Sequence, residues 1–302
     1  MTDLQNSRPA GLRPQAFTAL GRVFDPLTYW THRVVVVLAT VGGLVGLGRG
    51  LVDERSLADS LWAGVIGGFT VAAAWAIARE LDPDHDPSAL VAGGVALLGF
   101  AALQTPLWLV GVLAAIMLPR VINQSAGVPL FLTDAVFLVA FCAVLGLLGW
   151  WSWGVLLGVA LLANAWLPRS FALGVTFGAV GIIAAVAAAA LSDNLSVGIG
   201  EGAVGLLVSA TVLAYVFIVI PRFPARLASQ GDVGEERLLG LRVMVANIFA
   251  LAMLFGIGLQ GNRDGLDALP LWAALLGVLV WRLHQLSGGT QTSVQHSANE
   301  QQ

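Results

Sequence analysis

Lysine is absent from this 302-residue sequence, and all 15 basic residues are arginine. This absence excludes chemistry that needs a lysine amine, such as a Schiff base with retinal or pyridoxal phosphate. Cysteine is nearly absent as well. The single thiol, Cys142, excludes an intramolecular disulfide, and its apolar surroundings predict a packed, unreactive side chain.

Charged residues are scarce. They make up 11% of the sequence, against about 25% in soluble domains, whereas 57% of residues are hydrophobic and the mean hydropathy is +0.83. Polar side chains are too few to cover a globule, so lipid must be the solvent for most of the surface. The apolar stretches fill nearly the whole chain and predict one membrane domain. The lipid bilayer is therefore the expected partner, and nothing indicates nucleic acid.

Several catalytic motifs are missing. The sequence has no metalloprotease His/Glu spacing, no Gly-x-Ser-x-Gly elbow, no Walker loop and no Gly-x-Gly-x-x-Gly fingerprint. The Asn-xxx-Asp-xxx-Asp spacing of intramembrane prenyltransferases and the Asp-Gly-xx-Ala-Arg pattern of CDP-alcohol transferases are also absent. No cleavable signal peptide is expected, because about 30 polar and mixed residues precede the first apolar run.

Continuous apolar runs predict an all-α polytopic membrane protein, because a helix needs about 20 apolar residues to cross the hydrocarbon core. Ten crossings could form two inverted five-helix halves. The layout resembles that of the ten-helix drug/metabolite transporters, an analogy of architecture that no motif supports. The ten predicted helices are 33–50, 59–78, 88–104, 107–120, 130–150, 152–168, 171–191, 197–220, 238–260 and 270–285.

The positions of arginine predict the orientation. Short loops rich in arginine stay on the cytoplasmic side. With both termini inside, twelve of the 15 arginines are cytoplasmic, and only Arg49, Arg55 and Arg263 are outside. We therefore expect a multi-pass protein of the plasma or bacterial inner membrane. The apolar stretches that end in arginine do so at Arg79, Arg120, Arg169, Arg222 and Arg282.

The chain divides into three predicted parts. Residues 1–32 form a cytoplasmic segment, in which apolar residues at helical spacing predict an interfacial helix over 14–31. Residues 33–286 form the transmembrane domain, and the polar residues 287–302 form a disordered cytoplasmic tail.

Pairs of glycines four residues apart predict close helix packing within the chain. These pairs are Gly42/Gly46, Gly174/Gly178 and Gly198/Gly202.

An acidic loop between the second and third helices is the strongest local signal. In an extended chain, Asp82, Asp84 and Asp86 would point to one side, where their oxygens suit Mg²⁺ or Ca²⁺. His85 lies among them. Mg²⁺ is thus the one cofactor the sequence suggests. The alternatives are a solvated acidic turn and a gating or partner contact.

Other candidate residues lie near the predicted cytoplasmic ends of the helices. Asp134, one turn into the fifth helix, is either a substrate or coupling site, or an interfacial carboxylate that pairs with Arg120 or faces solvent. Glu201, near the outer end of the eighth helix, is either a proton-coupling carboxylate or a group that reaches outer water. The full set of substrate or coupling candidates is Asp134, Glu201, Arg120, Asn123, Asn164 and Arg169. Arg242 and Asn247 also lie near the predicted cytoplasmic ends of their helices.

Three functions remain open. The number of helices and the compact loops favour a transporter or permease, and an apolar bilayer midplane favours a small neutral or lipidic solute. Clustering of polar residues at the cytoplasmic face favours a divalent-metal enzyme acting on a lipid-linked phosphate. Glycine- and alanine-rich helices without motifs also fit a non-catalytic scaffold, and a homo-oligomer or a membrane-complex partner is left open. The weakly polar midplane residues are Thr70, Thr176, Ser209, Thr211 and Tyr215.

Overall fold

A computed structural model describes residues 18–22, 24–103, 108–195, 203–223, 226–232, 237–258 and 268–299. The described residues form ten α-helices, a short 3₁₀ helix and one β-hairpin. The helices are α1 (Trp30–Val52), α2 (Leu57–Leu81), α3 (Asp86–Leu103), α4 (Leu109–Asn123), α5 (Leu132–Leu147), α6 (Trp151–Asn164), α7 (Gly174–Leu191), α8 (Ala203–Ile218), α9 (Gly240–Gly258) and α10 (Leu269–Asn299). The 3₁₀ helix η2 (Ile220–Arg222) leads into strands β1 (Arg226–Gln230) and β2 (Arg237–Leu239), which pair antiparallel.

The prediction of an all-α membrane protein is confirmed at the level of fold class. Each helix overlaps one predicted range. Six helices are long and apolar enough to cross a membrane: α1, α2, α3, α7, α9 and α10. The four shorter apolar helices have 10–17 residues. At about 1.5 Å per residue they are shorter than the roughly 30 Å hydrocarbon core. Ten full crossings, and the orientation of the termini, therefore stay predictions.

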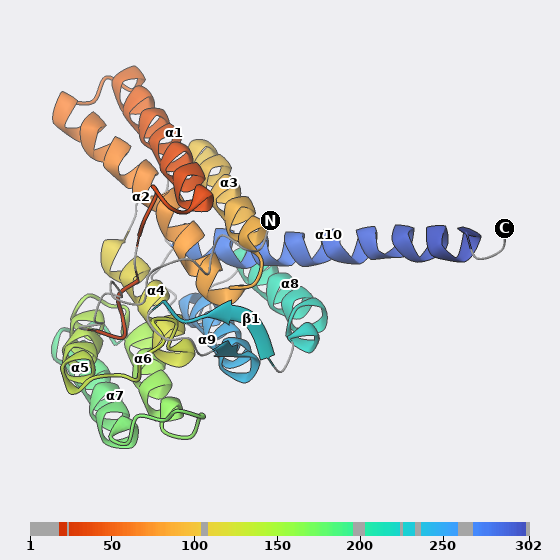
Figure 1. Cartoon of the computed structure of the whole chain (residues 1–302). Coiled ribbons are helices and arrows are strands. Elements are labelled where there is room, and N and C mark those ends of the chain that lie inside the picture. The colour runs from red at the N-terminus through yellow and green to blue at the C-terminus, as the bar shows by residue number, and fades with distance from the viewer. Residues whose placement is uncertain are drawn as a thin grey trace.

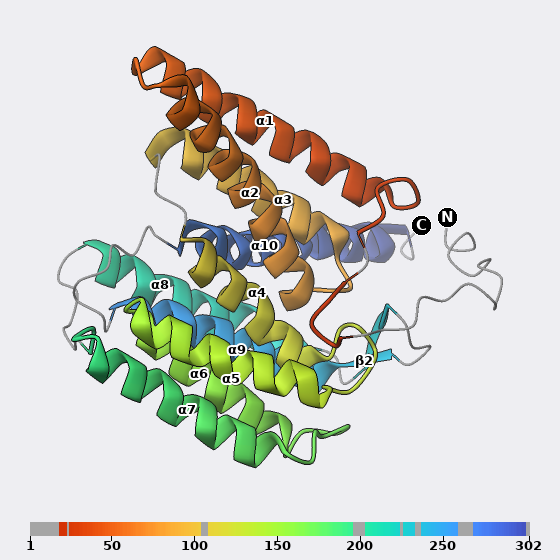
Figure 2. The same cartoon turned by 90° about the vertical axis from the view of Figure 1, so that its left-hand side faces the viewer.

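The helices pack as two groups, and helices α4 and α9 lie between them. Helices α1, α2 and α3 pack together, with α10 against α2 and α3, while α5, α6 and α7 form the second group. Helix α4 packs against α9, α6 and α2, and so connects the groups (Figures 1 and 2). The β-hairpin lies at one end of this assembly (Figure 2). At this end α2, α4 and α6 finish and α3, α5 and α9 begin; we call it the polar end.

Glycines allow the closest helix contacts, as the glycine pairs predicted. A Cβ on Gly46 of α1 would lie 2.3 Å from the Ala63 carbonyl oxygen of α2, and a Cβ on Gly178 of α7 would lie 2.6 Å from the Leu162 nitrogen of α6. Both contacts are within the chain, so these pairs serve internal packing. Gly198/Gly202 lies outside the described residues.

We expect Gly67→Ala to lower the free energy of unfolding by about 1–3 kcal/mol, because overpacking forces backbones apart. The new Cβ would lie 2.3 Å from the Gly42 carbonyl oxygen and 2.6 Å from the Phe100 ring. Gly94→Ala is the matched control: nothing lies within 4 Å of its Cβ, and this helical site should gain about 0.5–1 kcal/mol. Denaturant titration in detergent micelles measures both changes, and equal effects would contradict the packing.

Two local predictions are wrong. Residues 18–22 and 24–29 form bends and a turn, not the described part of an interfacial helix. Pro26 disfavours a helical Asp25, and Thr18, Ala19 and Arg22 bond to distant segments instead. We call the described residues 18–22 and 24–29 the N-terminal strap.

The second wrong prediction concerns the C-terminal tail. Helix α4 also ends slightly later than its predicted range. Helix α4 continues through Pro119 to Asn123, and the residue that follows it, Gln124, has a left-handed φ of 52°. Helix α10 continues to Asn299, beyond the start of the predicted disordered tail. Extending a formed helix needs no new nucleus, so a polar segment can follow a packed one. The domain boundaries themselves stay predictions.

Candidate functional site

The C-terminus of α2 is the centre of the polar end. The last carbonyl groups of a helix lack partners within the helix. Here the Asn123 side chain of α4 donates to the Glu80 carbonyl oxygen at 2.6 Å, and the Asn247 side chain of α9 donates to the Leu81 carbonyl oxygen at 2.9 Å. The Tyr215 hydroxyl of α8 donates to the Asn247 side-chain oxygen at 2.5 Å. Three helices therefore satisfy or support the end of α2.

Glu80 is a buried carboxylate held by two arginines. Its side chain is 1% exposed, and its Oε1 lies 3.1 Å from Arg120 Nε and 3.4 Å from Arg22 Nη1. Arg22 also donates to both carboxylate oxygens of Asp232, from Nε at 3.0 Å and from Nη2 at 2.9 Å. Burial alone would lower the pKa of Arg22, but Glu80 and Asp232 raise it above its ordinary value, so this guanidinium stays charged. Arg22 thus joins the strap, α2 and the turn after β1.

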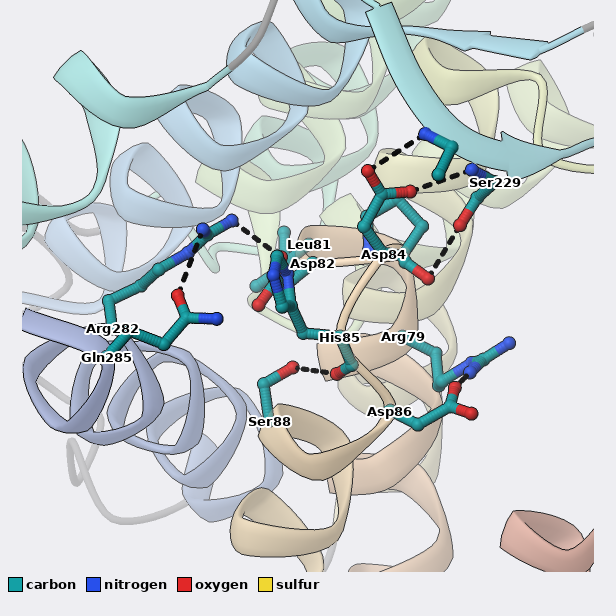
Figure 3. Close-up of polar contacts among 12 residues, drawn as sticks. Arg79, Leu81, Asp82, Asp84, His85, Asp86, Ser88, Ser229, Arg282 and Gln285 are labelled. Atoms are coloured by element: carbon teal, nitrogen blue, oxygen red, sulfur yellow. Dashed lines mark hydrogen bonds and ion pairs between the residues drawn. The ribbon is translucent and has the colours of Figure 1, made fainter. Parts of the chain in front are cut away.

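Asp82 makes the second buried ion pair. Its Oδ1 accepts from Arg282 Nη2 of α10 at 2.8 Å and lies 2.9 Å from His85 Nδ1. The Asp82 side chain is 1% exposed and Arg282 is 9% exposed, whereas His85 is partly open to solvent. Figure 3 shows Arg282 directed toward Asp82. The Phe223 ring lies 5.7 Å from the Arg282 guanidinium. Asp82 therefore fixes α10 against the end of α2.

The other two acidic-loop residues have separate partners. Asp84 accepts from the backbone N–H groups of Ala228 and Ser229 in β1, at 3.0 and 2.8 Å. Asp86 pairs with Arg79 on α2 (Figure 3). These contacts hold the hairpin and the first turn of α3 against α2.

The predicted metal site is therefore not formed. The prediction assumed an extended chain, but Asp82 follows α2, Asp84 lies in a turn and Asp86 starts α3, so the three carboxylates diverge (Figure 3). In the part of the chain that the structure describes, no group of three or more histidine, cysteine, aspartate or glutamate side chains could hold a metal ion.

Asn164 and Arg242 connect α4, α6 and α9. The Asn164 side chain of α6 donates to the Val121 carbonyl oxygen at 2.6 Å and accepts from the Phe171 N–H at 3.2 Å. Arg242, 1% exposed, donates to the carbonyl oxygens of Ile122 and Pro168. These bonds satisfy carbonyl groups at and after helix ends.

Arg169 takes part through its backbone. Its carbonyl oxygen accepts from Gln124 at 3.1 Å and from Arg242 at 3.0 Å, while its side chain lies exposed. Its φ of 63° is left-handed. Arg169 therefore helps to position the chain after α6, and the Arg242 guanidinium bonds to this backbone.

Asp134 binds the strap, an arrangement that neither sequence interpretation contained. Its carboxylate accepts from the Thr18 hydroxyl at 2.6 Å, the Ala19 N–H at 2.9 Å and the Phe131 N–H at 3.1 Å. The last bond caps the start of α5. Asp134 is 4% exposed, so it does not face solvent. Arg120 bonds to Glu80 and to the Leu20 carbonyl oxygen instead. Glu201 lies outside the described residues.

The sequence interpretation placed Arg120, Asn123, Asn164, Arg169, Arg242 and Asn247 at one end of the bundle, and the structure joins them there. It did not foresee the partners Arg22, Asp232 and Arg282. Arg22 lies 58 residues from Glu80 in sequence, and Arg282 lies 200 residues from Asp82. No local pattern could have revealed such pairs.

A groove of about 520 Å³ lies on the surface of the α1–α2 pair, away from the charged network. It is lined by residues of α1 between Val36 and Leu47 and of α2 between Leu61 and Gly68. Its polar side chain is Thr40, whose hydroxyl donates to the Val36 carbonyl oxygen within α1. The groove is therefore apolar in character.

Comparisons with protein-family models, with curated proteins and with solved structures give no match. The fold and the site together define a helical membrane protein in which charged and amide side chains tie helix ends together at one end of the bundle.

Proposed function

We propose that this membrane protein is a permease for a small neutral or lipidic solute, and that the polar end is its cytoplasmic gate. One observation carries the proposal: buried ion pairs join the end of α2 to segments far away in the chain, through Glu80–Arg22, Glu80–Arg120 and Asp82–Arg282. At the opposite end, the described residues contain one ion pair, the local and exposed Asp53–Arg55. Such asymmetry fits a bundle held shut at one end.

The apolar interior favours a neutral or lipidic solute. The buried carboxylates and guanidiniums of the described residues lie at the polar end. Further along the helices the buried polar groups of the described residues are neutral, such as Thr70 and Thr211. Among the described residues, a charged solute would meet no opposite charge there, which is costly inside a membrane. The apolar α1–α2 groove offers a lipidic solute contact from the side of the bundle.

The two alternatives receive less support. The enzyme hypothesis relied on a metal at Asp82, Asp84 and Asp86, which have separate protein partners. A scaffold needs no gate, so breaking an ion pair would change its stability and leave permeability unchanged. Permeability therefore distinguishes a scaffold from a permease.

Proteoliposomes containing the full chain provide the test. The probes are glycerol, followed by vesicle swelling, and a fluorescent phosphatidylcholine, followed by dithionite quenching. We expect at least one probe to cross the bilayer faster in vesicles that contain the wild type than in protein-free vesicles. Asp232→Asn removes one of the two carboxylate partners of Arg22. It should increase leakage by about twofold to fivefold, the equivalent of about 0.5–1 kcal/mol for a partly exposed pair.

Asp53→Asn is the matched control. It breaks an exposed arginine pair at the opposite end and should leave both rates unchanged. If folded wild type and Asp232→Asn both leave the two probes at the rate of protein-free vesicles, the permease proposal fails and the scaffold hypothesis gains.

A further inference from the structure

His32, at the start of α1, holds the strap through its imidazole ring. The residue is 8% exposed. Its ring stacks on Phe24 of the strap, with centroids 5.0 Å apart and 9° between planes, and meets the edge of Trp75 of α2 at 5.1 Å. The Asp25 backbone N–H lies 3.0 Å from His32 Nδ1. The ring therefore connects the strap with both α1 and α2.

The direction of this hydrogen bond fixes the protonation state of the ring. A backbone N–H can only donate, so Nδ1 must accept and the imidazole must be neutral. An imidazolium carries N–H on both nitrogens. Protonation of His32 would set two donors against each other at 3.0 Å, and the bond to Asp25 would be lost.

The charges around the ring act in both directions. Arg22 of the strap and Arg79 of α2 disfavour a positive ring, while the Asp25 carboxylate favours it, and the phenol of Tyr29 lies beside it. That carboxylate is engaged in its own turn, where it accepts from the N–H groups of Leu27 and Thr28. A cation–π contact with Phe24 would stabilise the protonated ring by about 0.5–1 kcal/mol. The buried donor left without an acceptor would typically cost about 1–3 kcal/mol, so the protonated ring is less stable in this position.

The strap connects the His32 hydrogen bond to the contacts of the proposed gate. Arg22, three residues before Asp25, pairs with Glu80 and Asp232, while Thr18 and Ala19 bind Asp134. The Leu20 carbonyl oxygen accepts from Arg120 at 2.7 Å. Loosening of residues 24–29 would thus weaken several contacts across the polar end together.

We propose that His32 is a proton-operated latch: the imidazole takes up one proton, the hydrogen bond from Asp25 breaks, and the strap leaves the polar end. The strap is bound when the ring is neutral and released as the pH falls. An exposed imidazole is protonated below about pH 6.5, so release of the strap into solvent favours proton uptake. The link to permeation rests on the proposed function; the movement of the strap does not.

Spin labelling tests the latch without any solute. Leu27 is 91% exposed, so a nitroxide on Leu27→Cys in a Cys142→Ala background reports the mobility of the strap. In full-length protein reconstituted in vesicles, we expect an immobile signal at about pH 7.5 and a mobile one at about pH 5.

Two substitutions of His32 separate the latch from other titrating groups. His32→Asn keeps an acceptor near the Nδ1 position and cannot be protonated, so its signal should stay immobile at both pH values. His32→Phe keeps an aromatic ring without an acceptor, and should be mobile at both. Both variants retain His85. An unchanged wild-type signal, or an acid response in His32→Asn equal to that of the wild type, would overturn the latch.

Leakage of glycerol and of labelled lipid at the two pH values then tests the connection to the gate. An acid-mobile strap with constant leakage would leave the latch standing and count against the permease. Acid-induced leakage that His32→Asn abolishes would support both.

Discussion

Replacing Glu80 with glutamine is expected to lower the free energy of unfolding by about 3–5 kcal/mol, the typical cost of removing one partner of a buried ion pair. The side chain is 1% exposed and neutralises both Arg22 and Arg120. Glutamine has nearly the same shape but no charge, so both guanidiniums would lose their shared counter-ion. Denaturant titration of the purified protein in detergent micelles, followed by circular dichroism, measures the change.

Glu54→Gln provides the control for this substitution. Glu54 is exposed in the turn between α1 and α2, so its replacement should change stability by less than about 0.5 kcal/mol. A Glu80→Gln protein as stable as Glu54→Gln would contradict the buried network at the end of α2.

Replacing Arg282 with methionine should have an effect of similar size, about 3–5 kcal/mol, because Asp82 would keep a buried charge with no guanidinium beside it. Methionine retains most of the side-chain volume between α10 and Phe223. Adding Asp82→Asn should recover part of the loss, since the remaining group is then neutral. The same denaturant titration, applied to both single variants and the double variant, gives the interaction energy of the pair.

The recovery is the decisive part of this cycle. The cycle compares the effect of Asp82→Asn in the wild type with its effect in the Arg282→Met variant. If Asp82→Asn lowers the free energy of unfolding equally in both, the two side chains do not interact and the α2–α10 contact is wrong. Arg49→Met is a suitable control, because this exposed arginine donates to the Ala101 carbonyl oxygen and has no carboxylate partner among the described contacts.

Hydropathy was sufficient to locate the ten helices. In lipid, a backbone must satisfy its own hydrogen bonds, so a long apolar run has few alternatives to a helix. The glycine pairs were readable for a similar reason: only glycine permits the approach of Gly46 to Ala63. Helix ends were less predictable. Pro119 removes one backbone donor but leaves the rest of the ladder, so α4 runs on to Asn123.

The strap and the acidic loop show where local pattern fails. Apolar spacing favoured a helix over residues 14–31, but Asp134, 115 residues from Ala19, supplies the hydrogen bonds of the strap. The alternation of Asp82, Asp84 and Asp86 favoured one metal site, but β1 offers two N–H groups to Asp84, and α10 offers Arg282 to Asp82. Long-range partners replaced the locally favoured arrangement in both cases.

By itself, the sequence determined that the chain is a helical membrane protein whose charged side chains gather near alternate helix ends, because the cost of moving charge into hydrocarbon depends on residue type and depth alone. Which arginine meets which carboxylate was decided by the tertiary structure. An ion pair needs two groups within a few ångströms of each other, and that distance is set by how α2, α4, α10 and the strap pack together.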